Sequence, residues 1–173
     1  MTNRALDYEF VRSLVSLTWR EAYWGYQHGL IRWEALKDLA GDKLVQGSEK
    51  AYEIELAGLS AVEAHESEGL AKQLADQEMP TEVGRDQQVW LFLVLADLYL
   101  RRNEVEDAFA DIEVIYADFG YPEEIEGFVR FMPPSDGYEP LTHSHQENLQ
   151  RSHRLWVQYL QAHGFDTGVD ASD

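Results

Sequence analysis

The sequence predicts an all-α protein, folded as a single irregular bundle of six to eight helices. Apolar residues recur three and four positions apart along most of the chain, while the alternation typical of strands is almost missing. Helix start and stop signals follow one another, and no repeat of fixed period suggests a solenoid. With 173 residues, 45% of them hydrophobic, the chain can build a core. We expect one domain over residues 1–164 and an acidic, frayed tail over residues 165–173.

The first third of the chain carries signals for three helices. Apolar spacing indicates a first helix around residues 10–17. Thr18 with Glu21 forms a capping box, in which each side chain satisfies a free backbone N–H of the other residue. The helix that follows should end at Gly29, because glycine tolerates the left-handed conformation after a last turn. A third helix is expected over residues 32–47.

The next segment is less regular. Ser48 is the expected N-cap of another helix. Ser60 with Glu63 forms a second capping-box pattern, and the helix that it opens is weakened by Gly69. That helix should end before Pro80, which begins a short connection.

Two helices of different character follow. Residues 85–102 are apolar on nearly all sides, so we expect this helix at the centre of the fold. Residues 105–119 form the clearest amphipathic pattern in the chain, with Gly120 as the residue after the helix end. Pro122 suits the first turn of a short further helix.

The last part of the chain begins with a turn-rich loop over residues 132–142. Ser144 with Glu147 forms a third capping-box pattern. The final helix that it opens should end near Gly164.

The formal net charge of −18 is spread unevenly. Residues 1–47 hold six basic and six acidic side chains, whereas residues 48–84 hold two and nine, and residues 85–140 hold four and thirteen. Such a field repels nucleic acid, whose phosphates need basic residues, and attracts basic proteins. An acidic surface also keeps a protein in solution, so charge alone does not establish a binding face. We expect a basic protein partner and no nucleic acid.

Composition also bears on where the protein works. The chain has no cysteine, which excludes disulfides and thiolate chemistry and fits a reducing compartment. Its most apolar run, residues 89–96, is far shorter than the roughly 20 residues of a membrane span. The first seven residues lack the pattern of a signal peptide. We therefore expect a cytoplasmic protein that has no membrane partner.

The common catalytic and cofactor motifs are missing from the sequence. None of the six histidines follows an Asp or Glu by three positions, and neither a nucleophile elbow, a phosphate loop nor a dinucleotide fingerprint is present. We expect no catalytic residue, no metal and no cofactor. His143, His145 and Glu147 could hold a stray metal, although a solvated first turn is the simpler interpretation. An enzyme with an unfamiliar site built from Asp107, Asp111, His143 or His145 stays open as an alternative.

The segment from Tyr116 to Pro140 interleaves aromatic and acidic residues, with Arg130 as its one basic residue. Aromatic side chains supply buried area to an interface, and carboxylates supply steering and ion pairs. The competing interpretation places Phe119, Phe128 and Phe131 in the core and Arg130 in a buried ion pair. The residues that we expect to contact a basic partner are Asp107, Asp111, Asp118, Tyr121, Glu123, Glu124, Asp136 and Tyr138.

Three strings in the chain resemble a bacterial family catalogued only as a domain of unknown function. The longest begins at Tyr116 and reads Y-A-D-F-G-Y-P-E-E-I-E-G-F-V-R-F-M-P-P-S-D-G-Y. The others are L-T-W-R-E-A-Y-W-G, from Leu17, and W-L-F-L-V-L-A-D-L-Y, from Trp90. The likeness extends over roughly residues 10–160. It implies a bacterial, single-domain, all-helical protein with no assigned activity and no catalytic residues.

Three functions are compatible with these observations. Small acidic bacterial proteins are often immunity proteins, so the first hypothesis is an immunity protein that neutralises a basic toxin domain. The second is a general protein-interaction adaptor that uses the same acidic face on a housekeeping partner. The third is the enzyme with an unrecognised carboxylate and histidine site.

Overall fold

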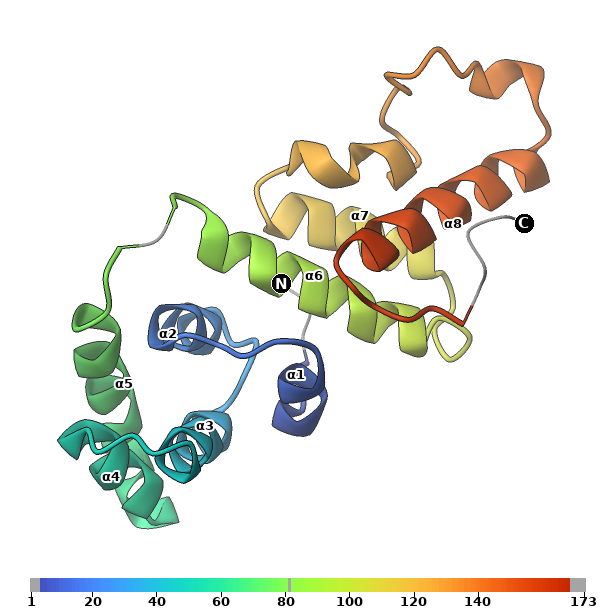
Figure 1. Cartoon of the computed structure of the whole chain (residues 1–173). Helices are drawn as coiled ribbons and strands as arrows, with labels where there is room; N and C mark the ends of the chain where they lie inside the picture. The colour runs from blue at the N-terminus through green and yellow to red at the C-terminus, as the bar shows by residue number, and fades with distance from the viewer. Residues whose placement is uncertain (1–3, 81, 169–173) are drawn as a thin grey trace. The chain divides into compact units, whose positions relative to one another are not determined.

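The computed structural model describes residues 4–80 and 82–168, and its helices are labelled in Figure 1. These residues form eight α-helices and three 3₁₀-helices and no strand, which confirms the all-α prediction and the number of helices. None of these helices is both long and apolar enough to cross a membrane. The chain divides within helix α6 into two compact units, Thr2–Leu93 and Val94–Asp173, and each is described by itself. That the chain is one domain stays a prediction.

The N-terminal unit contains five α-helices, one 3₁₀-helix and the start of a sixth α-helix. They are α1 (Tyr8–Leu14), α2 (Trp19–Gln27), α3 (Trp33–Val45), α4 (Ala51–Gly58), η1 (Ala61–Glu66), α5 (Ser67–Asp76) and α6 (Arg85–Leu100). Helix α3 packs on α4, and α2 packs on α5. Trp19, Leu36, Leu56 and Leu74 are fully buried among these helices.

Trp90, near the middle of α6, joins that helix to α2 within the N-terminal unit. Its indole is fully buried, and its Nε1–H donates a hydrogen bond of 2.7 Å to the carbonyl of Glu21. A Cβ atom at Gly25 would lie 2.1 Å from the Trp90 ring. Only glycine at position 25 therefore lets the two helices approach this closely.

The predicted capping boxes are present. The Thr18 N–H donates to Glu21 Oε2 at 2.9 Å, while Thr18 Oγ1 accepts from the Glu21 N–H at 3.2 Å. Ser144 and Glu147 make the same reciprocal pair at the start of α8. The Ser60 N–H and hydroxyl both donate to Glu63 Oε2, although the helix there begins as 3₁₀.

The predicted helix ends are also confirmed, since Gly29, Gly47, Gly120 and Gly164 all have positive φ. The prediction that Ser48 is an N-cap is wrong. Helix α4 starts at Ala51 with Lys50 as its N-cap, and no side chain satisfies its first N–H groups. The physical reason is that Ser48 accepts from the Lys50 N–H instead, in a turn that precedes the helix.

The C-terminal unit is built from the end of α6, α7 (Ala108–Asp118), η2 (Glu123–Phe128), η3 (Pro140–Thr142) and α8 (His145–Ala162). Helix α8 packs against η2. The core of the unit centres on Trp156, whose ring meets that of Tyr99 edge-on at 5.2 Å between centroids. Phe165, the first residue of the predicted tail, is buried against Tyr99. Residues 169–173 of that tail lie outside the described residues.

Candidate functional site

Two exposed aromatic side chains of the C-terminal unit, Tyr121 and Phe131, pack against a third that is buried, Tyr116. Tyr116, in the last turn of α7, is 2% exposed. The rings of Tyr121 and Phe131 lie 5.2 and 5.9 Å from its ring, yet these two residues are 62% and 58% exposed. We call Tyr121 and Phe131 the aromatic surface. The interpretation that places Phe131 in the core is wrong, because its side chain is 58% exposed although its ring contacts Tyr116.

Tyr121 has an unusual backbone. Its φ of 62° is the one positive value of a non-glycine residue in the described chain. Gly120 is also left-handed, with φ of 75°, and the two-residue turn lets the Tyr121 N–H donate to the Tyr116 carbonyl at 2.8 Å. A left-handed residue with a Cβ costs about 1–2 kcal/mol. Strain of this kind is often found at functional sites, so Tyr121 is the residue of this unit for which a function must be sought first.

The hydroxyl of Tyr116 fixes a neighbouring carboxylate. It donates a 2.9 Å hydrogen bond to Glu126 Oε1, in η2. Burial, and then this bond, raise the pKa of the Tyr116 phenol above its ordinary value. The phenol therefore stays protonated at neutral pH and acts as a fixed support for the aromatic surface.

Arg130, the residue before Phe131, forms ion pairs with two carboxylates of and beside α7. Its Nε donates to Glu113 Oε1 at 2.7 Å and its Nη1 to Asp107 Oδ2 at 2.8 Å. The expected ion pair is present, but it is not buried, since 31% of the Arg130 side chain is exposed. Asp107 is also the N-cap of α7, where it accepts the N–H groups of Phe109 and Ala110. The Arg130 hydrogen bond, followed by these backbone bonds, holds the pKa of Asp107 below its ordinary range.

The other predicted partner-binding residues fall into two groups. Glu123 and Glu124 are exposed in the first turn of η2, two and three residues after Tyr121, and Asp111 and Asp118 are half-buried on α7. Between Arg102 and Arg130 the sequence has nine Asp and Glu and no Lys or Arg. Tyr121 therefore belongs to a strongly negative stretch, and Phe131 directly follows Arg130, at which that stretch ends.

Asp136 and Tyr138 form the second group, around Arg151. The Arg151 Nη2 donates to Asp136 Oδ2 at 2.6 Å, and its guanidinium carbon lies 4.4 Å from the centre of the Tyr138 ring. Tyr138 in turn donates to Asn148 Oδ1 at 2.8 Å. The structure thus pairs these two residues with α8 rather than with Tyr116.

His143, near the start of α8, is engaged in local contacts. The His143 ring stacks on Tyr138 at 4.5 Å, and its Nδ1 lies 2.9 Å from the Thr142 hydroxyl. Glu147 is occupied by the capping box. Within residues 4–80 and 82–168, no group of three or more His, Asp or Glu side chains is arranged to hold a metal ion.

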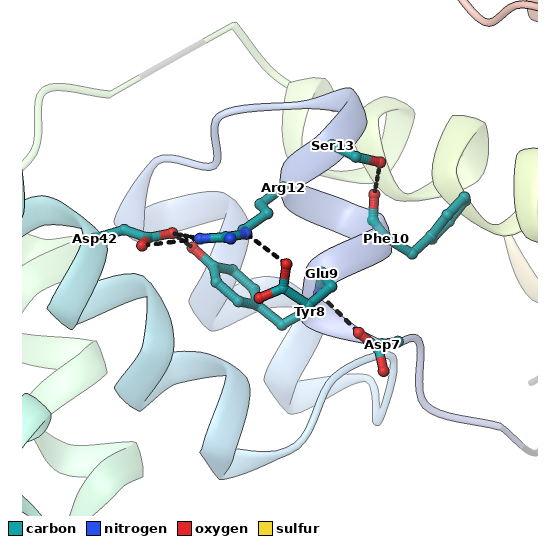
Figure 2. A network of polar contacts seen from close by, with 7 residues as sticks. All are labelled: Asp7, Tyr8, Glu9, Phe10, Arg12, Ser13 and Asp42. Atoms are coloured by element: carbon teal, nitrogen blue, oxygen red, sulfur yellow. Dashed lines mark hydrogen bonds and ion pairs between the residues drawn. The ribbon is translucent and has the colours of Figure 1, made fainter.

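A polar network in the N-terminal unit escaped the sequence-based reasoning. As Figure 2 shows, Tyr8 and Arg12 of α1 converge on Asp42 of α3: the Tyr8 hydroxyl donates at 2.9 Å, and Arg12 Nη1 donates at 3.1 and 3.2 Å. Arg12 Nε also donates to Glu9 at 2.9 Å. Burial and the Asp42 carboxylate raise the pKa of Tyr8. The spacing of Tyr8 and Arg12 places both on one helix face, but nothing in the sequence indicates a partner more than thirty residues away.

Comparison with known proteins gives one match. A family model described as an uncharacterized protein conserved in bacteria (DUF2247) matches residues 8–164. No curated protein and no solved structure gives a significant match to the chain.

Proposed function

The chain belongs to this bacterial family, whose description assigns no activity, and we propose that it is a non-enzymatic binding protein: an immunity protein that neutralises a basic toxin domain. The observation that supports the proposal is the aromatic surface. Tyr121 has a left-handed backbone and an exposed ring, and Phe131, which packs on the same Tyr116, is also exposed. Both side chains leave more than half of their surface uncovered by this chain.

The chemistry of this surface suits a partner rich in lysine and arginine. Large aromatic side chains are frequent anchors of interfaces, and arginine stacks on their faces. Carboxylates such as Glu123 and Glu124 would speed the encounter with a basic domain. A toxin that acts on nucleic acid needs a basic site for phosphates, and this acidic surface would occupy such a site in their place.

Co-expression with the product of the adjacent gene tests the proposal. We expect a stable complex and rescue of growth, with both lost in Tyr121→Ala combined with Phe131→Ala. The matched control is Val62→Ala combined with Leu141→Ala, because these two side chains are also strongly exposed but lie outside the aromatic surface. The control pair should bind and rescue like the unmodified protein. If the adjacent product is harmless and forms no complex, the immunity proposal is wrong.

Electrostatic steering can be measured on the same complex. Glu123→Gln combined with Glu124→Gln should slow association and flatten its dependence on salt, because rim charges act mainly on the association rate. Dissociation should change little. An unchanged association rate at low salt would remove the role of these carboxylates.

An adaptor that uses the same surface on a housekeeping protein is the second candidate. Exposure of the aromatic surface supports it equally, and capture from the native host separates the two. A partner that is abundant, harmless and lost on Tyr121→Ala would identify an adaptor. Metal analysis of the untagged protein tests the proposal that the chain is not an enzyme, since stoichiometric metal would contradict it.

A further inference from the structure

The C-terminal unit contains a cavity of about 210 Å³ between the segment after η2 and the first turns of α8. Its apolar wall is made of valine, methionine, leucine and proline side chains. The side chains that give it polar groups are Arg130, Tyr138, His145, Asn148, Arg151 and Ser152. All of them belong to the C-terminal unit, and the aromatic surface does not line the cavity.

The charge of this lining is opposite to that of its surroundings. Residues 94–173 hold 16 Asp and Glu against five Lys and Arg. The cavity nevertheless takes two of those five arginines and a histidine, and no Asp or Glu lines it. The lining thus differs in composition from the acidic surface of this unit, although carboxylates outside the cavity pair with both of its arginines.

Arg151 is held firmly in this wall. Its side chain is 13% exposed, and its Nη1 and Nη2 donate to the carbonyl of Gly127 at 3.2 Å and to Asp136 at 2.6 Å. Arg130 uses Nε and Nη1 for Glu113 and Asp107. Each guanidinium is thus neutralised by carboxylates that are not part of the lining. These bonds use Nη1 and Nη2 of Arg151 and Nε and Nη1 of Arg130.

The remaining polar groups are fixed before any ligand arrives. Tyr138 donates to Asn148, and Asn148 Nδ2 donates to the Pro140 carbonyl at 3.0 Å, which ties the loop to α8. Ser152, which follows Arg151 in α8 and is 9% exposed, adds a hydroxyl group. Donors held in place by neighbouring hydrogen bonds lose little entropy on binding.

We propose that this cavity binds a small molecule that carries one carboxylate on a compact apolar body. The arginine and serine donors suit a carboxylate, the strongest acceptor for a guanidinium, and the apolar wall suits a branched aliphatic chain. The cavity volume of about 210 Å³ suits a small molecule. This site does not depend on the proposed immunity function, and Tyr121→Ala should leave it unchanged.

Three probes on the full chain test the proposal: 4-methylpentanoate, its neutral amide, and a short peptide with a free C-terminal leucine. Amide NMR shifts of residues 127–152 report binding. We expect saturable shifts with the free acid and at least about tenfold weaker binding of the amide, since a hydrogen bond to a charged group is worth about 1.5–3 kcal/mol. If only the free acid binds, the natural ligand is a small free acid. If the peptide binds more tightly than the free acid, the carboxylate that the site recognises is the C-terminus of a peptide chain. Equal affinity of acid and amide, or no saturable shift with any probe, overturns the proposal.

A matched pair of variants locates the site. Arg151→Gln should weaken binding of the acid by at least about tenfold, whereas Arg154→Gln, on the exposed side of the same helix, should not change it. If Arg151→Gln fails to fold, Ser152→Ala keeps the Asp136 ion pair and should weaken binding about threefold. Equal affinities in the unmodified protein, Arg154→Gln and both pocket variants would contradict the assignment.

Discussion

Glu53 and Glu124 are both glutamates on short helices, and the molecule uses them in opposite ways. Glu53, in the N-terminal unit, is 1% exposed and accepts the indole N–H of Trp19 at 2.7 Å. Glu124, in the C-terminal unit, is exposed three residues after Tyr121. Glu78 repeats the first pattern, since its two oxygens accept the backbone N–H groups of Trp19 and Arg20 at the start of α2. Glu53 and Glu78 thus hold the N-terminal unit together, whereas no hydrogen bond within the described part of the chain gives Glu124 such a structural role.

The largest expected effect is the loss of Glu53. Glu53→Ala leaves the buried indole N–H of Trp19 without an acceptor, so the free energy of unfolding should fall by about 2–3 kcal/mol in urea denaturation. Glu53→Gln keeps an acceptor oxygen and should cost less than about 1 kcal/mol. Glu124→Ala should stay within about 0.5 kcal/mol of the unmodified protein. Equal losses for Glu53→Ala and Glu124→Ala would abolish the distinction between the units.

The network of Figure 2 should give a smaller loss, because it is partly open to solvent. Asp42→Ala removes the acceptor of both Tyr8 and Arg12 and should lower the free energy of unfolding by about 1 kcal/mol. Tyr8→Phe removes one of these bonds and should cost about half as much. Chemical denaturation monitored by circular dichroism measures both variants. No loss in Asp42→Ala would show that this network does not hold α1 to α3.

Tyr121→Gly separates stability from function. Glycine relieves the left-handed strain, worth about 1–2 kcal/mol, but loses a ring contact worth about 0.5–1.5 kcal/mol. We therefore expect stability to change by less than about 1 kcal/mol, while partner binding is lost. Thermal unfolding and co-purification are the two measurements. A large loss of stability would mean that Tyr121 is a structural residue.

The smallest effect is in the titration of four aspartates. Burial raises the pKa of Asp38 and Asp86 in the N-terminal unit, while hydrogen bonds from Arg130 and Arg151 lower the pKa of Asp107 and Asp136 in the other. A lowered pKa adds stability above the unfolded value of 3.8, and this is lost as pH falls through the folded pKa. A raised pKa has the opposite effect on stability. Asp38 and Asp86 take up protons in the folded state first, so the free energy of unfolding rises as pH falls towards 3.8.

Carboxyl NMR measures these four values directly. Asp107 and Asp136 should titrate below 3.8, and Asp38 and Asp86 above it. Arg130→Gln and Arg151→Gln should each return the partner aspartate towards its ordinary value. The reverse order of the two pairs would contradict the contrast between the units.

Local signals in the sequence were enough to predict the helices. Capping boxes at Thr18 and Ser144 and glycine ends such as Gly29 and Gly120 act within a few residues, so short-range spacing reveals them. The uneven charge and the acidic stretch around Tyr121 can also be read directly from the sequence. Ser48 misled the prediction because serine can close a turn as easily as it caps a helix.

The tertiary structure alone decided which of these side chains are exposed and what they contact. Phe128 and Phe131 occupy similar contexts in the sequence, yet one is 2% exposed and the other 58%. The Asp42 partner of Tyr8 and the two arginines of the cavity lie far apart along the chain. Helix periodicity specifies which face of an element is apolar, whereas contacts between distant elements depend on how those faces pack, and that information is not local.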